Sequence, residues 1–327
     1  MVDIYYTVAP SSLPLAKELI QAGASGARLT FSFGTPGIQH ERARELKSIA
    51  HTVQKPFEII ADLEGGGLRL GEISIGGHSI FSVVTDEIIS YVHAKKVTEK
   101  ALPVSDKSTF DSLTIGDRLI VGDNNAVFDV VGTDQVKALF DAEVESSRGL
   151  YVQGGVNTFT CLTEKDRSDI QEILTHPDLY DSIALSFVSQ ADEVTQVREM
   201  CLSAGVDMKI IAKIETGLGL NNIKEICAAA DTIMVARGDL ALDLPWCEMP
   251  KAVDAVVETC LQTDTPYIMA TQVAESMGKN QYMTRAEMTD LWQWKQRGAQ
   301  GVLLSREVAW GDHPVLVVEH VQKLLSA

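Results

Sequence analysis

The sequence predicts an α/β protein built as an eight-stranded parallel (β/α)₈ barrel, with a β-rich module inserted after the third strand. Short, continuously apolar runs alternate with stretches whose apolar residues recur at helical spacing, and this alternation supplies eight strands and eight helices. Continuously apolar strands are typical of a parallel sheet that helices cover. With eight units the sheet is expected to close into a TIM-type barrel, and a doubly wound open sheet is the alternative.

The first three strands are short, and a turn or a helical stretch bounds each of them. The run IYYTVAP (4–10) precedes a helical stretch around 13–22, and GARLTFS (26–32) precedes another around 39–53. The run FEIIADLE (57–64) is the expected third strand, and the alternation breaks after it.

Residues 71–159 have the pattern of a β-rich module and contain no convincing long helix. They hold strand-like pieces such as HSIFSVVTD and GDRLIVGDNNAVFDVVG, which Gly, Asn and Asp turn signals such as GDNN punctuate. We therefore expect a barrel of residues 1–70 and 160–327, interrupted by an inserted domain of residues 71–159. Because the module leaves after the third strand, at the end where barrel sites are built, we expect it to act as a lid.

Alternation resumes near residue 160 and continues through the rest of the sequence. Thr163 is placed to cap a helix together with Asp166, and TRAE (284–287) has the spacing of a capping box. The remaining strands are expected at 182–188, 208–215, 232–240, 266–271 and 301–305, and helices at 191–204, 220–229, 248–263, 284–297 and 314–325.

The charge balance narrows the range of partners. The 327 residues include 28 Lys and Arg against 45 Asp and Glu, a net charge of −17. We expect no nucleic-acid and no membrane partner, because phosphate surfaces attract local excesses of Lys and Arg. A small anionic substrate is compatible with this charge where local cations or a metal overcome the overall field.

The cysteines and the N-terminal sequence bear on the compartment. Five widely spaced cysteines without a C-x-x-C pair suggest buried free thiols in a reducing cytoplasm rather than disulfides or a zinc site. The first residues lack a signal-peptide pattern, and no apolar run reaches transmembrane length. We therefore expect a cytoplasmic protein.

Polar residues gather at the C-terminal ends of the predicted strands. Singly, each has a structural explanation such as capping the next helix, but in a barrel these positions converge on one site. They are Arg28, Thr30, Ser32, Asp62, Ser186, Lys213, Glu215, Arg237, Asp239, Thr271, Ser305 and Glu307.

The run IIAKIETGLGL (210–220) suggests a metal-assisted site. Lys213 and Glu215 are two positions apart on one strand, so their side chains face the same way, as a buried ion pair would also require. Asp239 ends the next strand, and two carboxylates with open positions for water and substrate typically hold Mg²⁺ or Mn²⁺. The metal would screen Glu215 from Lys213, so the ammonium group would be available to bind a phosphate. The backbone at Gly238 can approach a ligand and bind a carboxylate.

Several segments together resemble the pyruvate kinase family. The catalytic Lys-x-Glu and A-R-G-D-L blocks of that family are similar to IIAKIETGLGLNNIKEICAAADTIMVARGDLALDLP, and its A-T-Q-x-x-E-S-M block is similar to ATQVAESM (270–277). GARLTFSFGT, ADLEGGGLRLG and TRAEMTDLWQWKQRGAQGVLLSREVAWGDHP also follow its motifs. The resemblance covers the barrel from end to end and, more loosely, the inserted module.

The resemblance implies phosphoryl transfer from phosphoenolpyruvate to ADP, giving pyruvate and ATP through a Mg²⁺-stabilised enolate. It implies that the substrate phosphoryl group binds to two cations, that a divalent metal binds to two carboxylates, and that Thr271 lies near the carbon that is protonated. The implied residues are Arg28 and Lys213 for the phosphoryl group; Glu215 and Asp239 for the metal; Gly238, Asp239 and Thr271 for the substrate carboxylate; Ser186 and Arg69 for further substrate contacts; and Ser32 and Asp62 for a monovalent cation.

The sequence departs from the family pattern at several positions. Gly67 replaces the Glu that accompanies potassium dependence, so a K⁺ requirement is not expected. Several further departures fall where the family binds or neutralises ADP phosphates, so the sequence lacks several of the family's nucleotide-binding residues. The departures are Thr30 for Asn, Leu63 for Thr, Glu64 for Lys, Phe33 for His, Ser189 for Arg, and YVQGGVN without the lysine that precedes G-V-N.

Two other functions therefore stay open. The first is a metal-dependent lyase, decarboxylase or other phosphoenolpyruvate or 2-oxo acid enzyme that does not use ADP. The second, a non-catalytic metabolite sensor, would not require the metal carboxylates together with Lys213 and Thr271. The sequence ends after the eighth helix, so we expect the family's C-terminal domain to be absent. Because that domain provides part of the family's subunit contacts, the sequence does not decide whether the protein forms a homo-oligomer.

Overall fold

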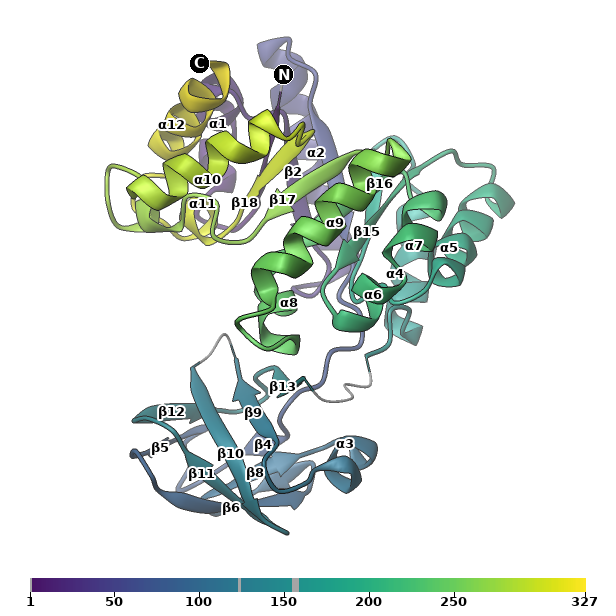
Figure 1. Ribbon diagram of the computed structural model, residues 1–327. Helices are drawn as coiled ribbons and strands as arrows, with labels where there is room; N and C mark the ends of the chain where they lie inside the picture. The colour runs from purple at the N-terminus through teal and green to yellow at the C-terminus, as the bar shows by residue number, and fades with distance from the viewer. Residues whose placement is uncertain (1, 123–124, 155–158) are drawn as a thin grey trace. The chain divides into compact units, whose positions relative to one another are not determined.

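Residues 2–122, 125–154 and 159–327 are described in a computed structural model (Figure 1). The chain forms two compact units. The barrel unit comprises the residues up to Gly65 together with Cys161–Gly238 and Pro250–Ala327, and the β-rich unit comprises Gly66–Thr160 and Asp239–Met249.

The barrel unit contains a closed parallel sheet in the order β1-β18-β17-β16-β15-β14-β3-β2. Each strand pairs in parallel with both neighbours, which confirms the expected (β/α)₈ barrel and excludes the open doubly wound sheet. The strands are β1 (Asp3–Thr7), β2 (Gly26–Thr30), β3 (Glu58–Asp62), β14 (Ser182–Leu185), β15 (Lys209–Ile214), β16 (Thr232–Ala236), β17 (Tyr267–Ala270) and β18 (Gly301–Leu304).

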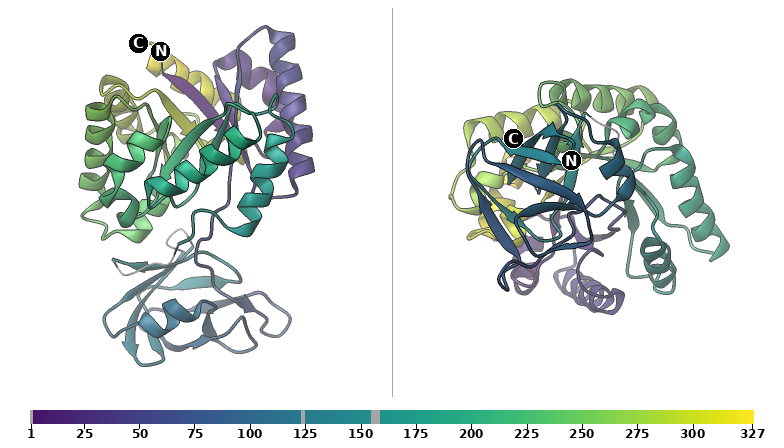
Figure 2. Two further views of the ribbon diagram at one scale, coloured as in Figure 1. Left: turned by 90° about the vertical axis from the view of Figure 1, so that its right-hand side faces the viewer. Right: turned by 90° about the horizontal axis from the view of Figure 1, so that it is seen from below.

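Helices surround this sheet, as Figure 2 shows. Both predicted capping boxes are present: Thr163 accepts from the Asp166 amide, and Thr284 accepts from the Glu287 amide. The helices that follow the barrel strands on the outside are α1 (Ala16–Ala22), α2 (Pro36–Val53), α4 (Glu164–Leu174), α5 (Ala191–Ser203), α7 (Ile223–Ala229), α9 (Met249–Thr263), α10 (Arg285–Gln296) and α12 (Pro314–Ser326). Further helical segments lie in the connections: η1 (Leu13–Leu15), α6 (Gly217–Asn221), α8 (Arg237–Asp243), η2 (Glu275–Gly278) and α11 (Arg306–Ala309).

The sixth barrel strand is shorter than the sequence predicts. Residues 232–240 were expected to form one strand, but β16 ends at Ala236 and α8 begins at Arg237. The prediction was wrong because a short apolar run does not distinguish a strand from a short helix, and Leu240 and Leu242 are buried from a helix here. Similarly, the helix expected at 220–229 is divided into α6 and α7.

Two apolar clusters hold the barrel unit together. The larger one lies between the sheet and its helices, and the smaller one draws its side chains from the strands and fills the barrel. The smaller cluster consists of Tyr5, Ile60, Ala184, Ile211, Met234, Ile268, Ala270 and Leu303. On β2 the corresponding position is Gly26, where a Cβ atom would lie 2.7 Å from the Tyr5 ring, so glycine makes room for the tyrosine.

The β-rich unit follows β3 in the chain and has its own apolar core. It contains a six-stranded sheet, β13-β9-β10-β11-β6-β8, and two two-stranded sheets, β12-β5 and β4-β7. The elements are β4 (Glu72–Ile73), β5 (Ile80–Val83), β6 (Ile88–His93), β7 (Lys96–Val97), β8 (Ala101–Val104), α3 (Lys107–Ser112), β9 (Arg118–Val121), β10 (Ala126–Gly132), β11 (Gln135–Ala138), β12 (Ala142–Glu145) and β13 (Leu150–Gln153). Part of the predicted GDNN turn, residues 123–124, lies outside the described residues.

The two segments through which the chain enters and leaves the β-rich unit are hydrogen-bonded to each other. The Gly66 amide donates to the Thr160 carbonyl at 2.6 Å, and the Thr160 amide donates back at 3.1 Å. A second segment, Asp239–Met249, packs in the same unit through Leu242 against Ile120. This segment was expected in the barrel of residues 1–70 and 160–327, whereas the structure groups it with the β-rich unit. That the unit acts as a lid stays a prediction.

The structure also shows the state of the cysteines and the character of the helices. All five cysteines are free thiols, four of them buried, and Cys247 is exposed. Within the part of the chain that the structure describes, no helix combines the length and apolar character needed to span a membrane.

Candidate active site

A polar layer lies directly above the apolar filling of the barrel. Alternate residues of a strand face the same side, so Thr7, Asp62 and Lys213 follow Tyr5, Ile60 and Ile211 on the inward face. Arg28 has the same relation to Gly26 on β2. Since these positions sit at the C-terminal ends of parallel strands, the fold brings together cations and carboxylates that lie far apart in the sequence.

Lys213 is the centre of this layer. Its Nζ lies 2.9 Å from Asp62 Oδ1 and 3.4 Å from Glu215 Oε1. The three residues are 7%, 2% and 4% exposed, so the charges compensate one another away from water. Strand β14 lies between β15 and β3 and carries the small Ala184 at the level of Asp62, which leaves room for the lysine to reach across.

Lys213 is held in its charged form. Burial by itself lowers the pKa of this ammonium, but the adjacent Asp62 and Glu215 carboxylates outweigh that effect and raise the pKa above its ordinary value. The side chain therefore carries a full positive charge at neutral pH.

Arg28 approaches the same carboxylate from the other side. Its Nη1 lies 3.3 Å from Asp62 Oδ2, and its Nη2 donates to Thr7 Oγ1 at 2.6 Å. The Thr7 hydroxyl donates in turn to the Leu304 carbonyl at 3.2 Å, so β1 fixes the guanidinium. Sequence reasoning did not single out Thr7, although its position two residues after Tyr5 at a strand end was the available signal.

Glu215 is fixed by the loop that follows β14. Its Oε2 accepts from the Phe187 amide at 2.6 Å, and Phe187 has a left-handed φ of 54°. The neighbouring Ser186 hydroxyl donates to the Leu63 carbonyl at 2.7 Å. These bonds tie the ends of β3, β14 and β15 together around the polar layer.

Thr271 and Gly238 meet where the neighbouring strands β17 and β16 end. Thr271 follows β17 with a φ of 69°, which is unusual for a β-branched residue. A Cβ atom at Gly238 would lie 3.1 Å from Thr271 Cγ2 and 3.3 Å from its Oγ1, so glycine permits this close approach. The structure thus brings Arg28, Asp62, Lys213 and Glu215 into one group and Gly238 and Thr271 into another.

Comparison with known proteins identifies the family. The family model described as "Pyruvate kinase, barrel domain" matches residues 2–318. The chain belongs to the pyruvate kinase family. Similar relatives include the pyruvate kinases of Thermotoga maritima, Thermoplasma acidophilum and Geobacillus stearothermophilus, which are 30%, 31% and 32% identical over 98% of this chain. The chain spans 69%, 57% and 56% of those relatives' lengths.

Three further residues that the pyruvate kinase pattern singles out have surroundings of their own. Asp239 belongs to the segment grouped with the β-rich unit, where Tyr151 Oη donates to its Oδ1 at 2.5 Å. Arg69, also in the β-rich unit, donates to the Ser147 carbonyl at 3.4 Å. Ser32 lies in the turn after β2 and is half-buried. In the part of the chain that the structure describes, no three His, Cys, Asp or Glu side chains cluster as a ready-made metal site.

The departures from the pyruvate kinase pattern occupy defined places. Glu64 lies 3.5 Å from the Lys165 ammonium, and the Ser189 amide donates to Glu193 at the start of α5. Phe33 is 66% exposed in the turn after β2. The Gly154 amide, just before the expected G-V-N residues, donates to the Asp243 carbonyl, while residues 155–157 themselves lie outside the described part. Glu64 and Ser189 therefore take part in local ion pairing and helix capping.

Proposed function

We propose that this chain is a pyruvate kinase-like phosphotransferase that moves a phosphoryl group from phosphoenolpyruvate to ADP. The observation that carries the proposal is the convergence of Arg28 and Lys213 on Asp62 at the C-terminal ends of the barrel strands. Two fixed cations within reach of one point are what a transferring phosphoryl group requires, because its catalysis is mostly positioning and charge neutralisation.

Each side chain then has a role that its surroundings support. Arg28, oriented by Thr7, would bind phosphoryl oxygens, and the protonated Lys213 would neutralise the charge that develops on them. The Gly238 backbone and the Thr271 hydroxyl would hold the substrate carboxylate. Thr271 would also lie near the carbon that takes up a proton when the enolate becomes pyruvate. Ser186 and Arg69 would supply further substrate contacts.

Glu215 and Asp239 would hold Mg²⁺ or Mn²⁺. Carboxylate oxygens are the donors that these ions prefer, and Asp239 already accepts a hydrogen bond from Tyr151, which orients it. When bound, the ion would supply positive charge to the phosphoryl oxygens and to the enolate oxygen.

We do not propose a potassium requirement. Asp62, one of the two residues that the family pattern assigns to a monovalent cation with Ser32, already has Lys213 at one oxygen and Arg28 at the other. A further cation at this carboxylate would be repelled by both. Gly67 also stands where potassium-dependent members of the family have a Glu, which agrees with the absence of a potassium requirement.

The second candidate is an enzyme that forms pyruvate or a related 2-oxo acid without ADP. The local bonds of Glu64 and Ser189 favour it, because the family pattern has cationic residues at these positions. The Arg28 and Lys213 cluster still favours a phosphorylated substrate over a simple 2-oxo acid.

Pyruvate release with and without ADP separates the two candidates. With phosphoenolpyruvate and Mg²⁺, we expect pyruvate to form only when ADP is present, with one ATP per pyruvate, because the phosphoryl group needs an acceptor. Coupled assays for pyruvate and for ATP measure both products. Release at the same rate without ADP would reject the kinase and support the second candidate.

Gly238→Ala tests the approach of α8 to Thr271. The new methyl group must push the threonine aside by a few tenths of an ångström, so we expect pyruvate formation to fall about tenfold. The thermal midpoint should change little, because alanine favours the helix by about 1 kcal/mol and offsets the crowding. Gly37→Ala is the matched control, since its Cβ would meet no atom nearer than 3.9 Å. Equal activity of both variants would contradict the role of this contact.

A further inference from the structure

The turn after β17 adopts a conformation that needs external support. Thr271 and Gln272 are consecutive non-glycine residues with left-handed φ values of 69° and 54°. Such values are costly for ordinary residues, above all for a β-branched threonine, and persist where the surroundings impose them. The backbone of Thr271 sets where its hydroxyl lies, so whatever supports this turn also controls that hydroxyl.

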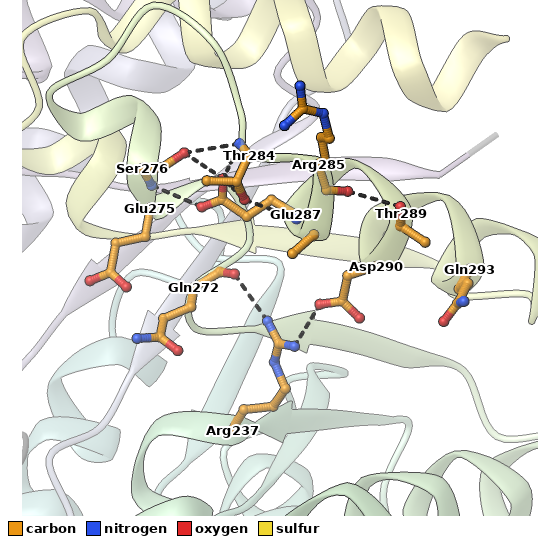
Figure 3. A pocket seen from close by; sticks show the side chains of 11 residues that line it. Arg237, Gln272, Glu275, Ser276, Thr284, Arg285, Glu287, Thr289, Asp290 and Gln293 are labelled. Atoms are coloured by element: carbon orange, nitrogen blue, oxygen red, sulfur yellow. Dashed lines mark hydrogen bonds and ion pairs between the residues drawn. The ribbon is translucent and has the colours of Figure 1, made fainter.

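One guanidinium group binds the whole turn. Arg237 Nη2 donates to the Thr271 carbonyl at 2.5 Å and to the Gln272 carbonyl at 3.1 Å, and its Nε donates to the Ala270 carbonyl at 3.3 Å. Three consecutive carbonyls therefore point at the same planar group. Figure 3 shows this side chain reaching toward Gln272 on one side and Asp290 on the other.

Helix α10 fixes Arg237 from the opposite side. Asp290 Oδ2 lies 2.8 Å from Arg237 Nη1, and the guanidinium carbon stacks 4.2 Å from the centre of the Trp294 ring. Asp290 and Trp294 are one helical turn apart, so they present a single face to the arginine. The side chain is 16% exposed and has little freedom to move.

We infer that Arg237 is a positioning residue, which holds the Thr271 hydroxyl in place through the three carbonyls of the turn. The inference rests on the proposed function, in which Thr271 contacts the substrate. Its neighbour Gly238 lies where an added Cβ atom would crowd the Thr271 side chain, so α8 passes close to the side chain as well as holding the backbone.

Arg237→Lys tests the inference because lysine keeps the charge but has neither the planar fork nor the stacking surface. We expect kcat for pyruvate formation to fall about tenfold to a hundredfold, as for other small displacements of a reacting group. In a Thr271→Ala background the same change should cost less than about threefold, because the hydroxyl it positions is gone. A purely structural arginine would lower kcat by the same factor in both backgrounds, and that result would overturn the inference.

Two further variants keep the experiment decisive. Arg297→Lys is the matched control, since this arginine pairs with Asp254 at the far end of α10, and its kcat should equal the wild type. If Arg237→Lys does not fold, as judged by circular dichroism, Asp290→Asn takes its place in the same cycle. An active wild type with equal fold-changes in both backgrounds rejects the positioning role alone. A wild type that forms no pyruvate rejects the proposed function and, with it, the role of Thr271.

Discussion

Lys213→Met is expected to destabilise the barrel by about 3–5 kcal/mol at neutral pH and to abolish phosphoryl transfer. The substitution keeps most of the side-chain volume but takes the cation away from Glu215, which is 4% exposed, and leaves Asp62, which is 2% exposed, with Arg28 alone. Uncompensated charges away from water are the costly case for a buried ion pair. Denaturant unfolding at pH 7 measures the free energy, and the coupled assay measures turnover.

The pH dependence of the variant provides a second measurement. In the wild type the raised pKa of Lys213 makes its contribution fully present below about pH 10, the ordinary lysine range, and lost as the pH rises through the raised value. Between pH 5 and 8 it is therefore constant. The difference in unfolding free energy between the wild type and the variant should therefore narrow at alkaline pH, as Lys213 of the wild type loses its proton.

Lys209→Met on the same strand is the matched control. That lysine is 62% exposed and lies 3.5 Å from Glu58, so its removal should cost no more than about 1 kcal/mol. A stability loss for Lys213→Met as small as the control's, or full turnover on a phosphorylated substrate, would show that the buried cluster does not work as described.

Asp239→Asn has the second largest expected effect. Asparagine keeps the shape of the side chain and can still accept from Tyr151, so the fold of the segment should survive. It removes one of the two negative charges proposed to hold the divalent ion, so activity at a fixed Mg²⁺ concentration should fall by about a thousandfold or more. Removing metal from the wild type with a chelator should cause a similar loss.

Metal binding can be measured apart from activity. Titration with Mn²⁺, followed by calorimetry, should show weaker binding for Asp239→Asn and unchanged binding for Glu248→Gln, an exposed carboxylate of the same segment. Identical Mn²⁺ titrations for wild type and Asp239→Asn would mean that the metal site is assigned to the wrong residues.

Much of the barrel and its polar layer follows from local patterns in the sequence. Strand periodicity is enough to place Lys213 and Glu215 on one face, and the end of β3 places Asp62 near them. Both capping boxes follow from spacing alone, since their partners are three residues apart. In these places the local chemistry and the final fold agree.

The remaining features depend on contacts between distant residues. Neighbouring residues do not predict three of these features. They are the end of β16 at Ala236, the orientation of Arg28 by Thr7, and the binding of Arg237 to three carbonyls in the turn after β17. The grouping of Asp239–Met249 with the β-rich unit depends on the packing of Leu242 against Ile120, which lies more than a hundred residues earlier in the chain. Local propensity does not encode which surface a short helix covers.

The bridge between Gly66 and Thr160 bears on how the barrel reaches its native state. Strands β3 and β14 are neighbours in the sheet, although about 120 positions separate them, and joining the ends of so long a flexible loop costs entropy. Once the β-rich unit has folded, its paired ends shorten the effective loop to about 26 residues, which lowers that cost by about 1 kcal/mol. The pairing of β3 with β14 is therefore less costly when the insertion has already folded than when it is still unfolded.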